Sequence, residues 1–180
     1  MSTRREFMQQ LTALAAVVPL MGLGLASRRA LAADAGWFMP DEAEQQARAF
    51  VAYAAQADVW EDWADAVNDT IGELARTIAD YQPVTVLCRP EDLAAAKAAC
   101  GTSNTSFLTL PMDDIWCRDY GGCFVMNESG ELGLVDFNFN GWGDKQAHAN
   151  DAAVAQDLSD EFHNVLKFDF QQAILWLRVS

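Results

Sequence analysis

The segment from Pro111 to Gly121, which reads PMDDIWCRDYG, holds the residues of this chain best suited to chemistry. Carboxylates accept the forked N–H donors of a guanidinium group, and the face of an indole attracts its positive charge. The pattern therefore predicts a binding site for a flat organic cation. The side chains concerned are Asp113, Asp114, Trp116, Arg118 and Asp119.

The same side chains also have a purely structural interpretation. Carboxylates cap turns, and Arg118 can form a local ion pair with one of them. A position directly after a strand favours binding instead, because α/β folds place their sites at the carboxyl ends of strands. Trp116 adds to the binding interpretation, since a tryptophan beside carboxylates suits a flat cation. The residues alone leave both interpretations open.

The elements before this segment predict a strand–helix–strand order. Met39–Glu42 is expected to lead into a helix, and a further helix is predicted over Trp60–Asp80. Val84–Cys88 predicts a buried strand because it is short, apolar and β-branched. Pro90 and the acidic residues after it open a helix that ends near Gly101. One apolar face is predicted for the Trp60–Asp80 helix: Trp63, Val67, Ile71, Leu74 and Ile78.

The elements after that helix complete a mixed α/β order. A strand over Ser106–Leu110 delivers the chain into the acidic segment. Cys123–Met126 and Leu132–Phe139 predict two strands, joined by a hairpin turn at Asn127–Gly130. A helix is predicted from about Asp151 to Phe162. Strand–helix–strand units followed by a hairpin indicate the α/β class.

The first 32 residues are expected to be a twin-arginine signal peptide. Arg4–Arg5 precedes an uncharged stretch, Leu11–Ala26, and small residues before Ala33 suit a signal peptidase. An ordinary Sec signal or an uncleaved anchor is the alternative. The stretch is shorter than the roughly 20 residues of a membrane helix, so no stable span is expected. Residues 33–38 read as a linker, and the expected location is periplasmic or secreted, with the twin-arginine translocase as a transient partner.

Charge and cysteine spacing exclude some classes of function. Removing residues 1–32 takes away four of the 12 basic and one of the 26 acidic residues, which leaves 8 and 25 and a net charge of −17. Nucleic acid is not an expected partner of such a chain, whereas small cations are. The spacing of the cysteines matches no zinc pattern, and most of them are read as small buried side chains. They are Cys88, Cys100, Cys117 and Cys123.

Two motifs together resemble the agmatine deiminase and bacterial-type peptidylarginine deiminase family of the pentein superfamily. The first is D-D-x-W-x-R-D followed by G-x-x-F-V, and the second is D-F-x-F-N-G-W-G-x-K. Similar stretches precede them in the family order, and the resemblance runs from about Met39 to Phe162. The motif residues are Asp113–Asp119, Gly121–Val125 and Asp136–Lys145, and the earlier stretches are Met39–Glu42, Pro83–Leu87 and Pro90–Leu93.

The resemblance implies a pentein-type α/β propeller of five blades, of which this chain holds about two. It also implies hydrolysis of a guanidinium group to a ureido group and ammonia, through a cysteine thiolate and a histidine, without metal or organic cofactor. In that scheme Asp119 binds the guanidinium and Trp116 lines the pocket. Asp113 and Asp114 contact the ligand or support the loop. A structural role is implied for Arg118, Gly121, Asn140, Gly141 and Trp142.

The chain also departs from the family pattern. Ala43, Gln45 and Gln46 stand where the family has a tryptophan and a Pro-His pair, which puts agmatine itself in doubt as the substrate. Gly122 replaces a proline. The Gly-rich His-Cys and E-G-G contexts that hold the family's nucleophile and base do not occur here. Cys117 fills a variable position of the motif, and the two histidines, His148 and His163, are read as surface residues.

The last residues give the reason expected for this loss. The deiminase-like domain is expected over residues 39–166, and another reading phase of residues 167–180 resembles the family's continuation. The sequence therefore predicts an out-of-frame tail after a frameshift, and a fragment that is unstable and inactive alone. The leading expectation is a guanidine hydrolase fragment without catalytic residues; the alternative is a non-catalytic guanidinium-binding module.

Overall fold

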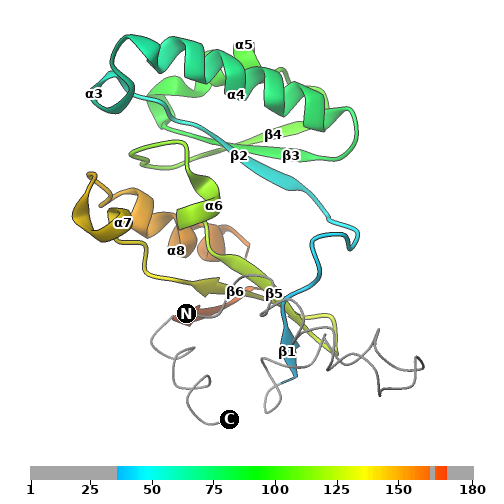
Figure 1. The fold of residues 1–180 in the computed structure, drawn as a ribbon. Coiled ribbons are helices and arrows are strands. Elements are labelled where there is room, and N and C mark those ends of the chain that lie inside the picture. The colour runs from blue at the N-terminus through cyan, green and yellow to red at the C-terminus, as the bar shows by residue number, and fades with distance from the viewer. Residues whose placement is uncertain (1–35, 163–164, 170–180) are drawn as a thin grey trace, which may run out of the picture.

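The computed structural model describes residues 36–162 and 165–169 and arranges them as two sheets with helices packed beside them (Figure 1). The first sheet is parallel, in the order β2-β3-β4, and consists of Ala49–Tyr53, Val84–Cys88 and Thr105–Thr109. The second sheet is mixed, in the order β1-β5-β6-β7. The predicted α/β class is confirmed, and the number of propeller blades stays a prediction.

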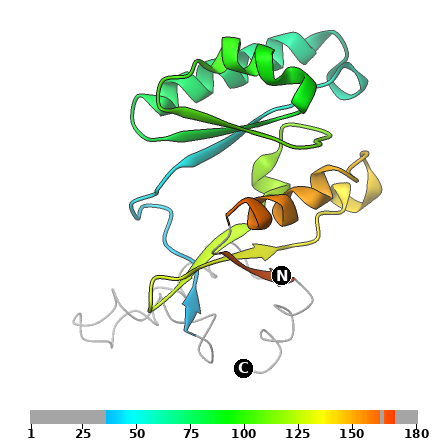
Figure 2. The same ribbon diagram turned by 180° about the vertical axis from the view of Figure 1, so that it is seen from behind.

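Helices α4 (Ala64–Ala79) and α5 (Leu93–Cys100) cover one face of the first sheet in both views (Figures 1 and 2). Each begins with a tighter turn, η2 (Glu61–Trp63) and η3 (Pro90–Asp92), and the short α3 (Ala57–Trp60) comes before η2. The fixed φ of proline suits such a first turn. Both predicted helices are therefore present, within a few residues of the predicted ends.

The first sheet buries both of its faces. Successive side chains of a strand point to opposite sides, so Val51 and Val86 join the core under α4 and α5. Ala52 and Leu87 point the other way and join a second core, which includes Leu134 of the second sheet and Leu158 of the helix beside that sheet. This second core links the two sheets, and it also packs the residue after β4, Leu110, against that helix and sheet.

The predicted apolar face of α4 is wrong in part. Trp63 is 69% exposed and Leu74 46% exposed, while smaller side chains face the sheet and α5. A Cβ atom at Gly72 would lie 2.9 Å from the Cβ of Ala99, so α4 and α5 approach too closely for larger residues. The buried residues of α4 are Asn68, Gly72 and Ala75.

The expected helix after Met39–Glu42 is also wrong, and strand β2 was not predicted. The carboxylate of Asp41 accepts the N–H of Ala43 at 2.9 Å, which forms a turn rather than a helix start. The segment Ala49–Tyr53 then pairs in parallel with β3. Its Phe50, Val51 and Tyr53 favour a strand by propensity, so a local strand signal was present and was overlooked among the alanines around it.

The predicted hairpin is confirmed as β5 (Cys123–Asn127) and β6 (Leu132–Asp136), which pair antiparallel. The connecting turn has Gly130 at φ +80°, a conformation that glycine adopts without strain. Strand β6 ends at Asp136 and not at the predicted Phe139. The Asp136 carboxylate accepts the N–H of Asn138 at 2.8 Å, and this local turn ends the pairing.

The predicted helix after the hairpin is α8 (Asp151–Glu161), and β7 (Val165–Asp169) runs parallel to β6. Strand β1 (Trp37–Phe38) pairs antiparallel with β5. The predicted signal peptide lies outside the described residues. The predicted tail, residues 167–180, begins within β7 and otherwise lies outside them too. Among the residues described, none of the helices has the length and apolar character needed to cross a membrane.

Candidate functional site

The acidic segment lies at the carboxyl edge of the parallel sheet, where the sequence predicted it. It follows β4, and a residue of the segment after β2 is hydrogen-bonded to its backbone. The amide of Gln56 donates to the carbonyl oxygens of Met112 at 3.3 Å and Asp113 at 2.9 Å. Arg89, which follows β3, donates to the carbonyl of Ala54 at 2.8 Å. The ends of all three strands thus form one bonded edge, with the segment anchored to it.

Asp114 is a fully buried carboxylate that organises this segment. One oxygen accepts the indole N–H of Trp60 at 2.6 Å and the backbone N–H of Ile115 at 2.8 Å. The other accepts the indole N–H of Trp116 at 3.0 Å and the amide of Gln146 at 2.9 Å. Four donors satisfy a charge that would otherwise be costly to bury. The carboxylate therefore fixes two indole rings and the loop that follows α7 (Gly141–Asp144).

Asp113 and Asp151 tie the segment to the start of α8 by reciprocal hydrogen bonds. The Asp113 carboxylate accepts the N–H of Asn150 at 2.8 Å and that of Asp151 at 3.2 Å, and the Asn150 amide at 2.7 Å. The Asp151 carboxylate in turn accepts the N–H of Asp113 at 2.7 Å and of Asp114 at 3.3 Å. Burial raises the pKa of Asp151 to about 6, although these two N–H groups lower it.

An aromatic wall stands beside this network. We use that name for Trp60, Trp116, Trp142 and Phe139. The rings of Trp60 and Trp116 are stacked, with centroids 6.2 Å apart at 28°, and Trp142 meets Trp116 edge-on at 6.2 Å and 87°. Phe139 supports Trp142 from behind at 5.0 Å. Trp116 and Trp142 are 42% and 39% exposed, so the wall presents two indoles to solvent.

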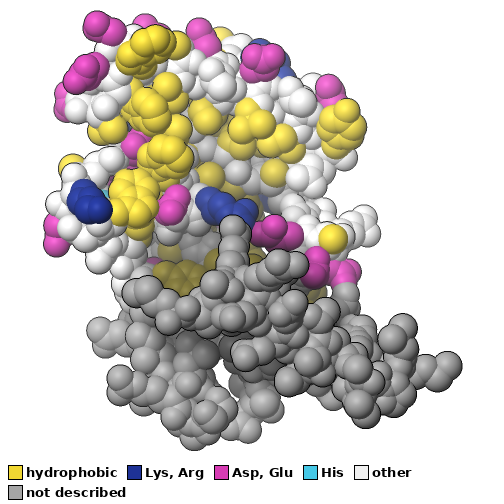
Figure 3. Space-filling view, viewed as in Figure 1, with side chains coloured by type: hydrophobic (Ala, Val, Ile, Leu, Met, Phe, Trp, Pro, Cys, Tyr) yellow, Lys and Arg dark blue, Asp and Glu magenta, His cyan; other side chains and the backbone are white. Residues whose placement is uncertain are grey.

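Asp119 lies at the exposed end of the wall, in the short helix α6 (Cys117–Tyr120). Its carboxylate is 3.4 Å from the indole nitrogen of Trp142, and its backbone N–H donates to the carbonyl of Trp116 at 2.8 Å. Figure 3 shows hydrophobic side chains reaching the surface over α3, α6 and α7, with both acidic and basic side chains around them. An exposed carboxylate beside indole faces can hold a guanidinium group by hydrogen bonds and by cation–π attraction.

Arg118 points away from this network. Its guanidinium forms an ion pair with Glu42 at 2.5 Å, and the two side chains are 87% and 70% exposed. The pair connects α6 to the turn that precedes β2. An exposed pair of this kind contributes little to stability, so Arg118 acts as a surface brace at most.

Two glycines in the motifs occupy positions where a side chain does not fit. A Cβ atom at Gly121 would lie 2.5 Å from the carbonyl oxygen of Cys117. At Gly141 it would lie 2.5 Å from the ring of His148, and the φ of +60° is also unfavourable for other residues. Asn140 accepts the N–H of Gly143 at 3.0 Å and so caps the turn that carries Trp142. The motif glycines allow the close turns on which the wall depends.

The described cysteines are free thiols with raised pKa values. Burial raises the pKa of Cys88, Cys100 and Cys117 to about 11 and also raises that of Cys123. Such thiols are protonated at neutral pH, whereas a nucleophile must be a thiolate. The ring of His148 lies 2.9 Å from the carbonyl of Gln146, and His163 is outside the described residues. In residues 36–162 and 165–169, no group of three or more metal-binding side chains occurs.

Five residues of the network were missed in the sequence: Gln56, Trp60, Gln146, Asn150 and Asp151. Their partners lie 32 or more residues away along the chain, so no local spacing connects them to the acidic segment. Asp151 gave a weak signal, because an acidic residue at the start of a predicted helix favours capping contacts.

Comparisons with known proteins agree on one family. The family model for Porphyromonas-type peptidyl-arginine deiminases matches residues 38–175. The agmatine deiminase of Stutzerimonas stutzeri is 34% identical over 110 residues, and that of Pseudomonas fluorescens is 32% identical over 108 residues. The solved structure of the Enterococcus faecalis agmatine deiminase is similar with a TM-score of 0.68, at 26% identity.

These similarities cover most of this chain and a smaller part of each relative. They extend over 61% and 60% of the chain for the two sequences and over 74% for the structure. The corresponding shares of the relatives are 30%, 29% and 38%. The chain thus spans about a third of the length of the proteins that it matches.

Proposed function

The chain belongs to the Porphyromonas-type peptidyl-arginine deiminase family, and on that premise we propose that it forms the guanidinium-holding part of an agmatine deiminase-like hydrolase. The observation that carries the proposal is the exposed carboxylate of Asp119 beside the exposed indoles of Trp116 and Trp142. The guanidinium lies flat against the wall and donates two N–H groups to Asp119. The substrate is agmatine or another guanidino compound, such as a peptidyl-arginine.

The other two carboxylates of the motif have a supporting role in this proposal. Asp114 uses both oxygens on four donors, and Asp113 is bonded to the start of α8. Neither has a carboxylate oxygen free of these contacts to offer a ligand. They hold the wall and α6 in place, while Asp119 and Trp116 meet the substrate.

For the chemical step we propose the scheme that the family resemblance implies, in which a cysteine thiolate attacks the guanidinium carbon and ammonia leaves. The described cysteines do not suit that role. Cys117 is the one nearest to Asp119 along the chain, yet its buried thiol has a pKa of about 11. The described residues therefore bind a guanidinium group without hydrolysing it through these thiols. The alternative of a module that only binds has no separate observation in its favour.

Titration calorimetry with agmatine tests the binding proposal. Asp119→Asn removes the charge and keeps the shape, and a lost charge-assisted hydrogen bond costs about 2 kcal/mol, or about thirtyfold in affinity. Asp69→Asn on α4 is the matched control, because it removes one exposed charge from a helix that contributes no residue to the wall. Equal affinity of the two variants for agmatine would contradict the proposal.

We also propose export by the twin-arginine route, which the paired Arg4–Arg5 and the mild apolar stretch after it support. Arg4→Lys together with Arg5→Lys keeps the charge and removes the paired-arginine signal. The double variant is expected to stay in the cytoplasm as an uncleaved precursor, measured by fractionation and immunoblotting. Export of the variant at the original level would contradict this route.

A further inference from the structure

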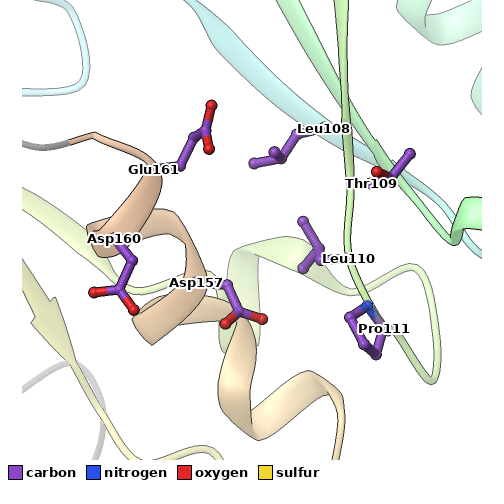
Figure 4. A pocket seen from close by; sticks show the side chains of 7 residues that line it. All are labelled: Leu108, Thr109, Leu110, Pro111, Asp157, Asp160 and Glu161. Atoms are coloured by element: carbon purple, nitrogen blue, oxygen red, sulfur yellow. The ribbon is translucent and has the colours of Figure 1, made fainter.

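A groove separate from the aromatic wall lies between the end of β4 and the last turns of α8 (Figure 4). Its volume is about 370 Å³. Helix α8 contacts Asp113 at its first residues, whereas the groove is at its other end. One wall of the groove is apolar and the other is acidic. The apolar side consists of Leu108, Leu110 and Pro111, and the acidic side of Asp157, Asp160 and Glu161.

The three carboxylates of the groove have no cationic partner among residues 36–162. Asp160 accepts the amide of the neighbouring Gln156 at 2.7 Å, which leaves its negative charge in place. Burial, and then the charge of Asp160, raise the pKa of Asp157. Three like charges within two turns of one helix repel one another. A cation placed in the groove relieves that repulsion.

The backbone of β4 offers a second kind of contact at the same place. Leu110 donates its N–H to β3, and the carbonyl of Asn104 accepts an N–H from β3. Alternate residues of a strand point their backbone groups to opposite edges, so those of Phe107 and Thr109 point away from β3. In the described part of the chain the first sheet ends at β4. These backbone groups are available to a further extended strand.

We propose that this groove binds an extended peptide segment of another protein that carries arginine or lysine. The segment pairs with the free edge of β4, and every second side chain turns toward α8. Its cationic side chains meet Asp157, Asp160 and Glu161, and their aliphatic stems pack on Leu108 and Leu110. This inference does not rest on the proposed guanidinium site.

Charge favours a basic segment over a second copy of this chain. The net charge of the chain is −14, and pairing of two β4 edges would bring two sets of groove carboxylates together. That arrangement places like charges side by side without a neutralising partner. A basic segment instead supplies the missing cations.

The probe for the test is a fluorescein-labelled, amidated heptapeptide of alternating arginine and valine, titrated against the 180-residue chain and followed by fluorescence polarisation. A second probe of the same sequence is N-methylated at alternate backbone amides, which keeps its charge and removes its strand pairing. We expect the methylated probe to bind at least tenfold more weakly to the same folded sample. Equal binding of the two probes would overturn the strand-pairing proposal.

A variant of the chain tests the position of the site. Asp157→Asn, Asp160→Asn and Glu161→Gln together are expected to weaken binding of the first probe at least tenfold. The control changes Asp58, Asp62 and Asp65 to asparagine, which alters the net charge by the same amount on α3, η2 and α4. If both triple variants weakened binding of the first probe equally, the proposal that the peptide binds in the groove would be overturned.

Two more measurements exclude other occupants. Saturating agmatine is expected to leave the probe bound; displacement would mean that the peptide binds at the aromatic wall. Sedimentation equilibrium is expected to show no self-association that depends on the groove, so the original chain and the triple groove variant should have the same oligomeric state. Such self-association would identify a second copy as the occupant and overturn the proposal.

Discussion

Two regions of the first sheet, the face under α4 and α5 and the carboxyl edge, are stabilised by different means. Under α4 and α5 the buried side chains are nearly all apolar, as at Val86 in the centre of β3. At the carboxyl edge the buried groups include the carboxylates of Asp114 and Asp151, each with specified hydrogen-bond donors. Apolar packing tolerates replacements of similar volume, whereas a buried carboxylate requires its own partners. The exposed wall therefore depends on polar contacts beneath it.

The largest effect is expected at Asp114. Asp114→Ala leaves four buried or half-buried donors without their acceptor, including the indole nitrogens of Trp60 and Trp116. The free energy of unfolding is expected to fall by about 4 kcal/mol, measured by urea titration with circular dichroism. Asp65→Ala, an exposed change on α4, is the control and is expected to stay within about 0.5 kcal/mol. If Asp114→Ala lowered the free energy of unfolding as little as the control does, the carboxyl edge would not depend on its buried carboxylate, and the contrast between the two regions would be wrong.

A somewhat smaller effect is expected in the apolar core. Val86→Ala opens a cavity in the core under α4 and α5 and is expected to cost about 2.5 kcal/mol. Because Val86 belongs to the core on the face of the sheet away from the acidic segment, the affinity of the remaining folded chain for agmatine is expected to be unchanged. Calorimetry below the unfolding transition measures that affinity. A large loss of affinity in this variant would mean that the wall depends on apolar packing as well.

The two regions are also expected to differ in how their stability depends on pH. The pKa of Asp151 is raised to about 6 from 3.8, so folding takes up a proton there. Its contribution to stability is complete below the unfolded pKa and is lost as the pH rises through about 6. Asp151→Asn keeps an acceptor and removes the titration. As the pH rises from about 4 to about 7, the free energy of unfolding of the variant is therefore expected to increase relative to that of the original chain by on the order of 2 kcal/mol.

Thermal melts of both chains across that pH range measure the difference. Asp69→Asn on α4 is the matched control, because Asp69 is exposed. If the difference in melting temperature between the Asp151 variant and the original chain stayed constant with pH, burial would not raise the pKa of this carboxylate.

The smallest effect is expected at the surface of α6. Arg118→Ala removes an ion pair with Glu42 in which both side chains are mostly exposed. The loss of stability is expected to be below about 0.5 kcal/mol, measured by the same urea titration. The affinity for agmatine is expected to be unchanged, since Arg118 points away from the wall. A tenfold loss of affinity would instead assign Arg118 to the site.

The elements that depend on local pattern were predictable from the sequence. Strand β3 is short and rich in β-branched residues, and the helical segment of η3 and α5 begins at Pro90 and ends before Gly101, so both were placed almost to the residue. Strand β2 was not predicted although Phe50, Val51 and Tyr53 carry a strand signal, because it is short and the alanines within and around it favour a helix. The face of α4 was misassigned for another reason, since close packing at Gly72 selects small residues.

The acidic segment of the candidate site was recognisable in the sequence, whereas the hydrogen-bond network that holds it was not. The motif around Trp116 and Asp119 identified the segment that meets solvent. Nothing local connects Asp114 to Trp60 or to Gln146, because those contacts span 54 and 32 residues of the chain. The roles of the three carboxylates differ through burial, which the sequence does not display: Asp119 is exposed, Asp114 is not.

The most direct test of the account is a titration of the isotope-labelled chain with agmatine, followed through its indole N–H signals by nuclear magnetic resonance. We expect shifts at Trp116 and Trp142, which face solvent in the wall, and none at Trp63, which is 69% exposed on η2. Putrescine, which lacks the guanidinium group, is expected to cause much smaller shifts at the wall. Equal shifts at Trp63 and Trp116, or no shift at either, would contradict the guanidinium site.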